Sequence, residues 1–162
     1  MATISLQPMS AVSTISGGVY EIRRYPEAAS QSFKKGELVY LASGKVTICG
    51  ADPSLILGIA MEDATGTTDT SIAVAIANKD TVFEGNVYHG TPASAITAIT
   101  DIGTNYGVVN ANNKWYVDVS DTSNVRVLVR DLSKKDVVGD TYGRVLFQVI
   151  QDYCQLDTDA NA

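Results

Sequence analysis

Apolar and polar residues follow one another along most of the chain in the pattern of β-strands. From Phe33 onward, short runs are either alternating or continuously apolar, and turns rich in Gly, Asn, Asp and Ser separate them. The pattern predicts about eight or nine short strands. The runs with strand character lie at residues 37–42, 45–49, 55–61, 71–77, 81–85, 87–90 (separated from the run before it by Gly85-Asn86), 106–110, 114–119, 125–130 and from 144 onward, and residues 17–25 could hold a further short strand.

Residues 32–50, "SFKKGELVYLASGKVTICG", carry the clearest hairpin signal. Two alternating runs flank Ser43-Gly44, and Gly44 supplies the positive φ that a two-residue hairpin turn requires. The next run, "LILGIAM", is continuously apolar, which predicts a strand buried on both faces. Gly58 inside this run predicts a bulge or a close approach of another backbone segment.

Residues 91–103, "TPASAITAITDIG", are the only segment with helical spacing. A Thr-Pro pair suits the start of a helix and a glycine suits its end. Isoleucine recurs at every third position, which favours one short helix here. These positions are Ile96, Ile99 and Ile102.

Strands at this spacing with one short helix are typical of a small antiparallel β-barrel or sandwich, which we expect to occupy residues 33–152. Residues 1–32 are rich in Ser, Ala and Thr and have little periodicity. We interpret them as an extended N-terminal arm that becomes ordered on a partner; a strand and loop of the same domain explain the segment equally well. Residues 153–162 are expected to form an acidic flexible tail.

Charge limits the classes of partner. The chain has 162 residues, a net charge of −6 and no Lys/Arg run longer than two residues. Nucleic acids and anionic membrane surfaces are bound through basic patches, so we expect neither partner. No apolar run approaches the roughly 20 residues of a spanning helix, and the first residues lack the pattern of a signal peptide. We therefore expect synthesis and folding in a cytosol.

Candidate chemistry is sparse. Cys49 and Cys154 fit no metal or redox spacing and are expected to be free thiols, so no cofactor or metal is predicted. His89 is the only histidine, and a hydrogen bond to nearby backbone is a better explanation for it than a catalytic role in a small hydrolase. Asp118 and Asp121 lie in "DVSDTSN", which resembles a calcium loop only loosely and is better explained as a turn that bonds its own backbone.

The aromatic residues permit two interpretations. Trp115 and Tyr116 are adjacent in the alternating run "KWYVDV", so their side chains point to opposite faces of a strand. One of them is then expected in the core. Exposed aromatic side chains serve as carbohydrate platforms or as interface hot spots, which leaves a carbohydrate-binding surface module as an alternative function.

Two blocks of the chain resemble a known family. "FKKGELVYLASGKVTICGADPSLILGIAMEDATG" (residues 33–66) is similar to the opening of the small head-decoration, or capsid cement, proteins of tailed bacteriophages. "TDIGTNYGVVNANNKWYVDVSDTSNVRVLVRDLSKKDVVGDTYGRVLFQVI" (residues 100–150) resembles their second half, in which an "IG-x-x-YG" turn precedes "WYVD" and a closing "GRVxFQ" strand. The family has no active-site residues to carry over.

The resemblance implies a barrel or β-tulip-like domain that binds the outer face of an expanded phage head. Such proteins commonly form homotrimers, clamp neighbouring subunits of the major capsid protein, and use N-terminal arms for strand addition. It therefore implies a structural, non-enzymatic virion protein without a cofactor. We expect its interface to include five residues: Tyr20, Ile22, Tyr25, Trp115 and Tyr116.

Overall fold

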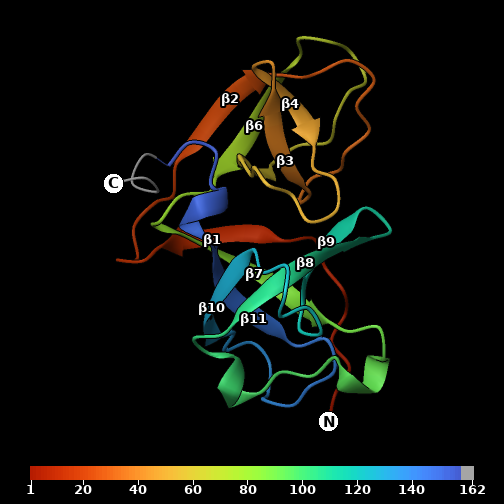
Figure 1. Ribbon diagram of the computed structural model, residues 1–162, viewed down its shortest axis with the longest axis vertical. Helices are drawn as coiled ribbons and strands as arrows, with labels where there is room; N and C mark the ends of the chain where they lie inside the picture. The colour runs from red at the N-terminus through yellow and green to blue at the C-terminus, as the bar shows by residue number, and fades with distance from the viewer. Residues whose placement is uncertain (158–162) are drawn as a thin grey trace.

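The computed structural model describes residues 1–157 and is mainly β (Figure 1). Five strands close into a barrel in the order β7-β11-β10-β8-β9, with β9 returning to β7. A sixth strand, β1, pairs with the edge of β7 that lies opposite β11. The bounds are β1 Ser10–Thr14, β7 Thr81–Tyr88, β8 Asn105–Ala111, β9 Lys114–Asp118, β10 Val127–Leu132 and β11 Arg144–Val149.

A second sheet of five strands lies above the barrel in Figure 1, in the order β2-β6-β5-β3-β4. All of its pairings are antiparallel. Its bounds are β2 Ile22–Pro26, β3 Leu38–Ala42, β4 Lys45–Ile48, β5 Gly58–Ala60 and β6 Ser71–Ile76. The fold is thus the predicted β-barrel with an added sheet.

One continuous apolar core joins the two sheets. Barrel residues such as Trp115 and Phe147 belong to the same buried cluster as Leu38 and Ile59 of the second sheet. A smaller cluster around Phe33 and its neighbours fills the second sheet itself. Burial of apolar area is the main stabilising contribution, so the shared cluster makes the barrel and the sheet one structural unit.

A cation reinforces the connection between the barrel and the second sheet. The Arg126 guanidinium donates to the carbonyl oxygens of Pro53 at 2.6 Å and Asp52 at 3.0 Å. It also lies 4.1 Å above the ring centroid of Tyr153. These contacts join the start of β10 to the β4–β5 connection and to the last helical turn, η3 (Gln151–Tyr153).

The hairpin and the glycine predictions are confirmed. β3 and β4 pair in register from Val39–Ile48 to Ala42–Lys45, and both turn residues have positive φ, 50° at Ser43 and 78° at Gly44. A Cβ placed on Gly58 would lie 1.9 Å from the carbonyl oxygen of Ala75. The backbone of β6 therefore approaches β5 so closely that only glycine fits.

The prediction of a helix over residues 91–103 is wrong. The segment forms two short 3-10 turns, η1 (Pro92–Ser94) and η2 (Ile99–Asp101), joined by extended backbone. A short helix is stable mainly when it buries an apolar face, and the isoleucines of this segment remain exposed. The buried side chains between the turns are those of Ala95 and Thr97, which an isoleucine pattern does not indicate.

The structure favours one of the two interpretations of the N-terminal residues, a strand and loop of the same domain. Within residues 1–32, β1 pairs with β7, β2 pairs with β6, and Met9 lies in the shared core, so these residues belong to the domain. The expected tail is partly packed as well: the side chain of Gln155 exchanges hydrogen bonds with the backbone of Leu41. The rest of the expected tail, residues 158–162, lies outside the described residues.

Two smaller differences concern the barrel. The strand predicted to break at Gly85-Asn86 runs through both residues as β7. The closing pair β7–β9 is parallel, although every other barrel pairing is antiparallel. Two parallel strands can be joined only by a long connection, because the chain must return to the end at which the first strand began. Residues 89–113 supply this connection: they form η1 and η2 after β7 and then run back as β8 before β9 begins.

Candidate interaction surface at the base of the barrel

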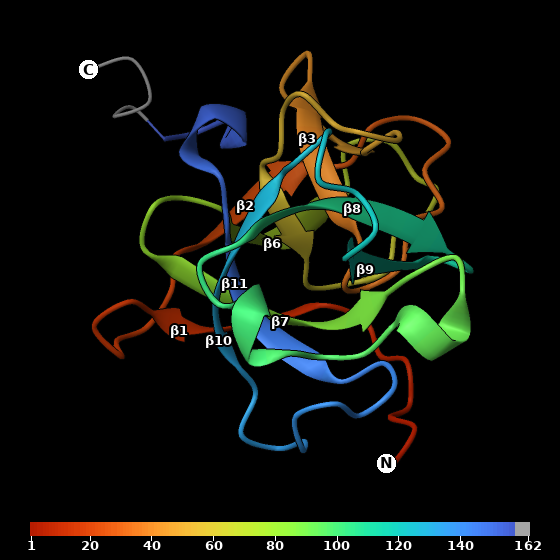
Figure 2. The ribbon, with the colours of Figure 1, turned by 60° about the horizontal axis from the view of Figure 1, so that its bottom comes forward.

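Exposed apolar side chains gather at the end of the barrel opposite the second sheet. Three segments meet there: the N-terminal residues, residues 91–103 and the β10–β11 loop (Figures 1 and 2). Short backbone bridges join them, Thr3 to Thr141 and Ile96 to Thr141. We call the exposed apolar residues of these segments the base surface: Met1, Ile96, Ile99, Ile102, Val137 and Val138.

The exposure of these side chains is unusual for their type. Met1 is 88% exposed, Val137 66% and Ile99 64%. Scattered apolar residues are normal on a protein surface, but a group contributed by three segments at one end of a domain makes that end a candidate interaction surface. A Cβ placed on Gly139 would lie 2.6 Å from Cε of Met1, so the N-terminus packs directly against the loop that carries Val137 and Val138.

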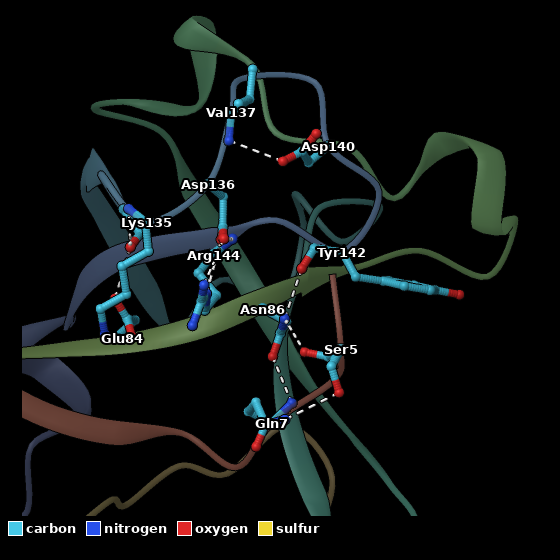
Figure 3. A network of polar contacts seen from close by, with 11 residues as sticks. Ser5, Gln7, Glu84, Asn86, Lys135, Asp136, Val137, Asp140, Tyr142 and Arg144 are labelled. Atoms are coloured by element: carbon cyan, nitrogen blue, oxygen red, sulfur yellow. Dashed lines mark hydrogen bonds and ion pairs between the residues drawn. The ribbon is translucent and has the colours of Figure 1, made fainter. Parts of the chain in front are cut away.

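A partly buried ion pair between Arg144 and Asp136 holds the β10–β11 loop (Figure 3). The Arg144 guanidinium donates to both carboxylate oxygens of Asp136, from Nη2 to Oδ1 at 2.6 Å and from Nε to Oδ2 at 2.9 Å. The backbone N–H of Arg144 also donates to Oδ2 at 2.9 Å. These hydrogen bonds lower the pKa of Asp136 below its usual value, although burial of the carboxylate acts in the opposite direction.

A second carboxylate in the same loop organises its tip. Asp140 accepts from the backbone N–H of Val137 at 2.9 Å and from that of Ala2 at 3.1 Å. The side chain of Asp140 therefore joins the loop to the N-terminal segment and holds the backbone beside the exposed Val137. Thr97 adds a third connection by accepting from the N–H of Gly139 at 3.1 Å.

β7 contributes two buried polar side chains to this network. Asn86 accepts from the N–H of Gln7 at 2.9 Å and donates to the carbonyls of Tyr142 at 2.7 Å and Ser5 at 3.2 Å (Figure 3). Glu84 accepts from Lys135 Nζ at 2.9 Å and from the Ser133 hydroxyl at 2.9 Å.

Together these contacts make the base surface preorganised. The backbone of the β10–β11 loop is held by hydrogen bonds to the side chains of Asp136, Asp140 and Thr97. Buried polar networks whose members are all paired favour a single conformation. A rigid surface loses little conformational entropy when a partner binds, so its apolar area contributes more fully to affinity. The arrangement is suited to binding a protein surface.

The predicted interface residues are not brought together. The alternating pattern predicted one of Trp115 and Tyr116 in the core, and the structure buries both side chains. Trp115 faces the shared core, whereas Tyr116 stacks on Tyr88 with ring centroids 5.2 Å apart. On the second sheet, Ile22 is exposed on β2 and Tyr25 packs partly against the smaller cluster around Phe33. Tyr20, which precedes β2, is half-buried against the shared core.

The other candidate residues have local structural roles. Nδ1 of His89 accepts from the N–H of Thr91 at 2.9 Å, as predicted for a hydrogen bond to nearby backbone. Asp118 accepts from both the N–H and the hydroxyl of Ser120, and Asp121 accepts from the N–H groups of Ser123 and Asn124. The prediction of a self-bonded turn is therefore confirmed.

Neither thiol is positioned for reaction. Cys49 and Cys154 are free and buried, and burial raises the pKa of each to about 12. Among residues 1–157, no group of three or more His, Cys, Asp or Glu side chains has the arrangement of a metal site. None of the helical turns in the described part of the chain has the length and apolar character needed to cross a membrane.

Sequence reasoning missed the base surface, although two signals for it were present. The isoleucine repeat of residues 91–103 predicts a short helix, whereas in the structure its side chains are exposed. The pair Val137-Val138 lies within the polar stretch "SKKDVVGDTYG", where two adjacent apolar residues have no strand to belong to. No family model matches the chain, and a comparison with curated proteins finds no match either.

Proposed function

We propose that this chain is a structural virion protein that binds the outer surface of an expanded phage capsid as a trimer. In this role it clamps neighbouring subunits of the major capsid protein and has no enzymatic activity. The choice of the major capsid protein as partner comes from the sequence resemblance to head-decoration proteins. The structural observation that carries the proposal is the base surface, an exposed apolar group held rigid by buried polar contacts.

The energetics of such a contact are reasonable. Each copy needs only a standard interface, about 800 Å² on its own side. A trimer then gains avidity, because binding of the first copy raises the effective concentration of the other two at the lattice. Because a preorganised base surface loses little entropy on binding, many copies that each bind with modest affinity can together stabilise a head.

The alternative of a carbohydrate-binding module rested on Trp115 and Tyr116. Both side chains are buried, so neither offers a ring face to a sugar. The hydrolase hypothesis rested on His89, whose Nδ1 accepts a backbone hydrogen bond. No observation favours either over capsid binding.

Binding to isolated heads tests the proposal. Expanded heads that lack this chain are mixed with the purified protein and sedimented, and we expect the chain to sediment with them. Val137→Asp places a charge in the base surface and should raise the dissociation constant by roughly 30-fold, the effect of an interface hot spot. Leu55→Asp is the matched control, because Leu55 is also exposed but lies at the second sheet. Equal binding by Val137→Asp and wild type would refute the role of the base surface.

A further inference from the structure

A second group of exposed apolar side chains lies around β1 and the connection from β1 to β2. We call it the shoulder surface: Val12, Ile15, Val19 and Ile22. Val19 is 89% exposed, the highest value for any valine, leucine or isoleucine within residues 1–157. The shoulder surface is separate from the base surface, because the base surface takes its residues from the far end of the N-terminal segment and from two barrel loops.

A hollow of about 170 Å³ lies beside the shoulder surface. It is formed where β1 meets the second sheet, and its apolar lining includes Ala11, Tyr20, Ile59 and Met61. Ala11 and Tyr20 of the lining adjoin Val12 and Val19 in the sequence, so the hollow and the projecting side chains belong to the same two segments of the chain. The volume of the hollow is sufficient for one aliphatic side chain.

Charge favours one particular occupant. The first 20 residues contain no Asp, Glu, Lys, Arg or His, although the chain as a whole carries a net charge of −6. The charges nearby add no net acidity, because Glu21 and Arg23 on either side of Ile22 pair with each other at 2.6 Å and the hollow is also lined by Lys35. Two copies repel each other where acidic surfaces meet, and this repulsion is smallest at a surface without net negative charge. The same molecule also supplies both the projection and the hollow, which is the condition for a head-to-tail contact that can close into a ring such as the proposed trimer.

The backbone of β1 is poorly placed for adding a strand. The N–H of Thr14 is bonded to the carbonyl of Gly18 at 3.1 Å, so the end of the free edge folds back on itself. The pairing of β1 with β7 also shifts register between Ala11 and Ser13, and such irregularities protect edge strands from pairing. Contact at this surface is therefore made by side chains.

We propose that copies of this chain contact each other through the shoulder surface, with Val19 of one copy seated in the hollow of the next. This inference rests on the self-association included in the proposed function, and it names the surface responsible. Because the contact joins apolar groups on like-charged molecules, association should become tighter as salt is added.

Sedimentation of the full chain without capsid tests this contact separately from head binding. Wild type should associate as concentration rises, more strongly at 1 M than at 0.1 M NaCl. Val19→Asp should weaken association by roughly 30-fold. Val137→Asp, in the base surface, should leave association unchanged.

A cross-linking experiment uses two different variants. A Val19→Cys chain is mixed with a Met61→Cys chain, and the proposed contact predicts a disulfide that joins the two variants. The inference is overturned if wild type remains monomeric at every concentration, if Val19→Asp associates like wild type, or if the mixed disulfide does not form. If Val19→Asp associates as strongly as wild type, the shoulder contact is refuted, but the proposed binding to the capsid is not.

Discussion

Replacing Asp136 with Asn tests whether the ion pair between Asp136 and Arg144 holds the β10–β11 loop in place. The side chain of Asp136 is 3% exposed and that of Arg144 is 23% exposed. The substitution removes the negative charge but keeps one oxygen that can accept hydrogen bonds. Breaking a fully buried pair costs about 3–5 kcal/mol. Because Arg144 regains some hydration, we expect the free energy of unfolding to fall by about 2 kcal/mol, or roughly 4–8 °C in Tm.

The pH dependence of this effect has a defined sign. The pKa of Asp136 is lower in the folded protein than in the unfolded chain, so the ion pair stabilises the fold fully above the unfolded value of about 3.9. This contribution is lost as the pH falls from about 4 through the folded pKa. Wild type should therefore lose more stability than Asp136→Asn between pH 7 and pH 3.

Urea denaturation followed by fluorescence is the assay, because Trp115 is the only tryptophan and is buried in the shared core. Asp69→Asn is the matched control. Asp69 forms a 2.7 Å ion pair with Lys45, but both side chains are exposed, so its loss should cost less than about 0.5 kcal/mol. If Asp136→Asn and Asp69→Asn change stability equally at pH 7, the account of the network is wrong.

Three further outcomes are expected from the core and the chain ends. Deleting residues 2–14 should abolish cooperative unfolding by circular dichroism, because it removes β1 and the buried Met9; a stable truncated chain would restore the interpretation of an arm. Gly58→Ala should destabilise the fold by about 3 kcal/mol or more in urea titrations, since its Cβ has no space beside β6, and a smaller loss would contradict that contact. Cys49 and Cys154 should react with a thiol reagent at pH 8 only after unfolding, and rapid labelling of the native protein would contradict their burial.

Local signals in the sequence were sufficient for most of the sheet structure. The turn at Ser43-Gly44 and the close approach at Gly58 depend on backbone geometry that only a few residue types permit, so sequence specifies them directly. β1 was missed because "SAVST" is short, contains small residues, and owes its strand conformation to pairing with β7. The helix prediction failed for a related reason. Isoleucines at every third position are compatible with a helix, but the spacing does not show whether another part of the protein packs against them.

The candidate site was less accessible to sequence reasoning, because it depends on residues far apart in the chain. The contacts of Asn86 to Ser5 and Tyr142 span 81 and 56 positions. No periodicity in the sequence reports such pairings. Exposure itself is a tertiary property, so the same valines and isoleucines that indicate a core in one context form an interaction surface in another.

Hydrogen exchange of the chain bound to expanded heads is the most direct test of the central claim. The account predicts that backbone amides in residues 91–103 and 133–143 exchange more slowly on heads than in the free protein, because the base surface faces the capsid. Protection confined to the second sheet, with both base segments exchanging as they do in the free protein, would contradict it.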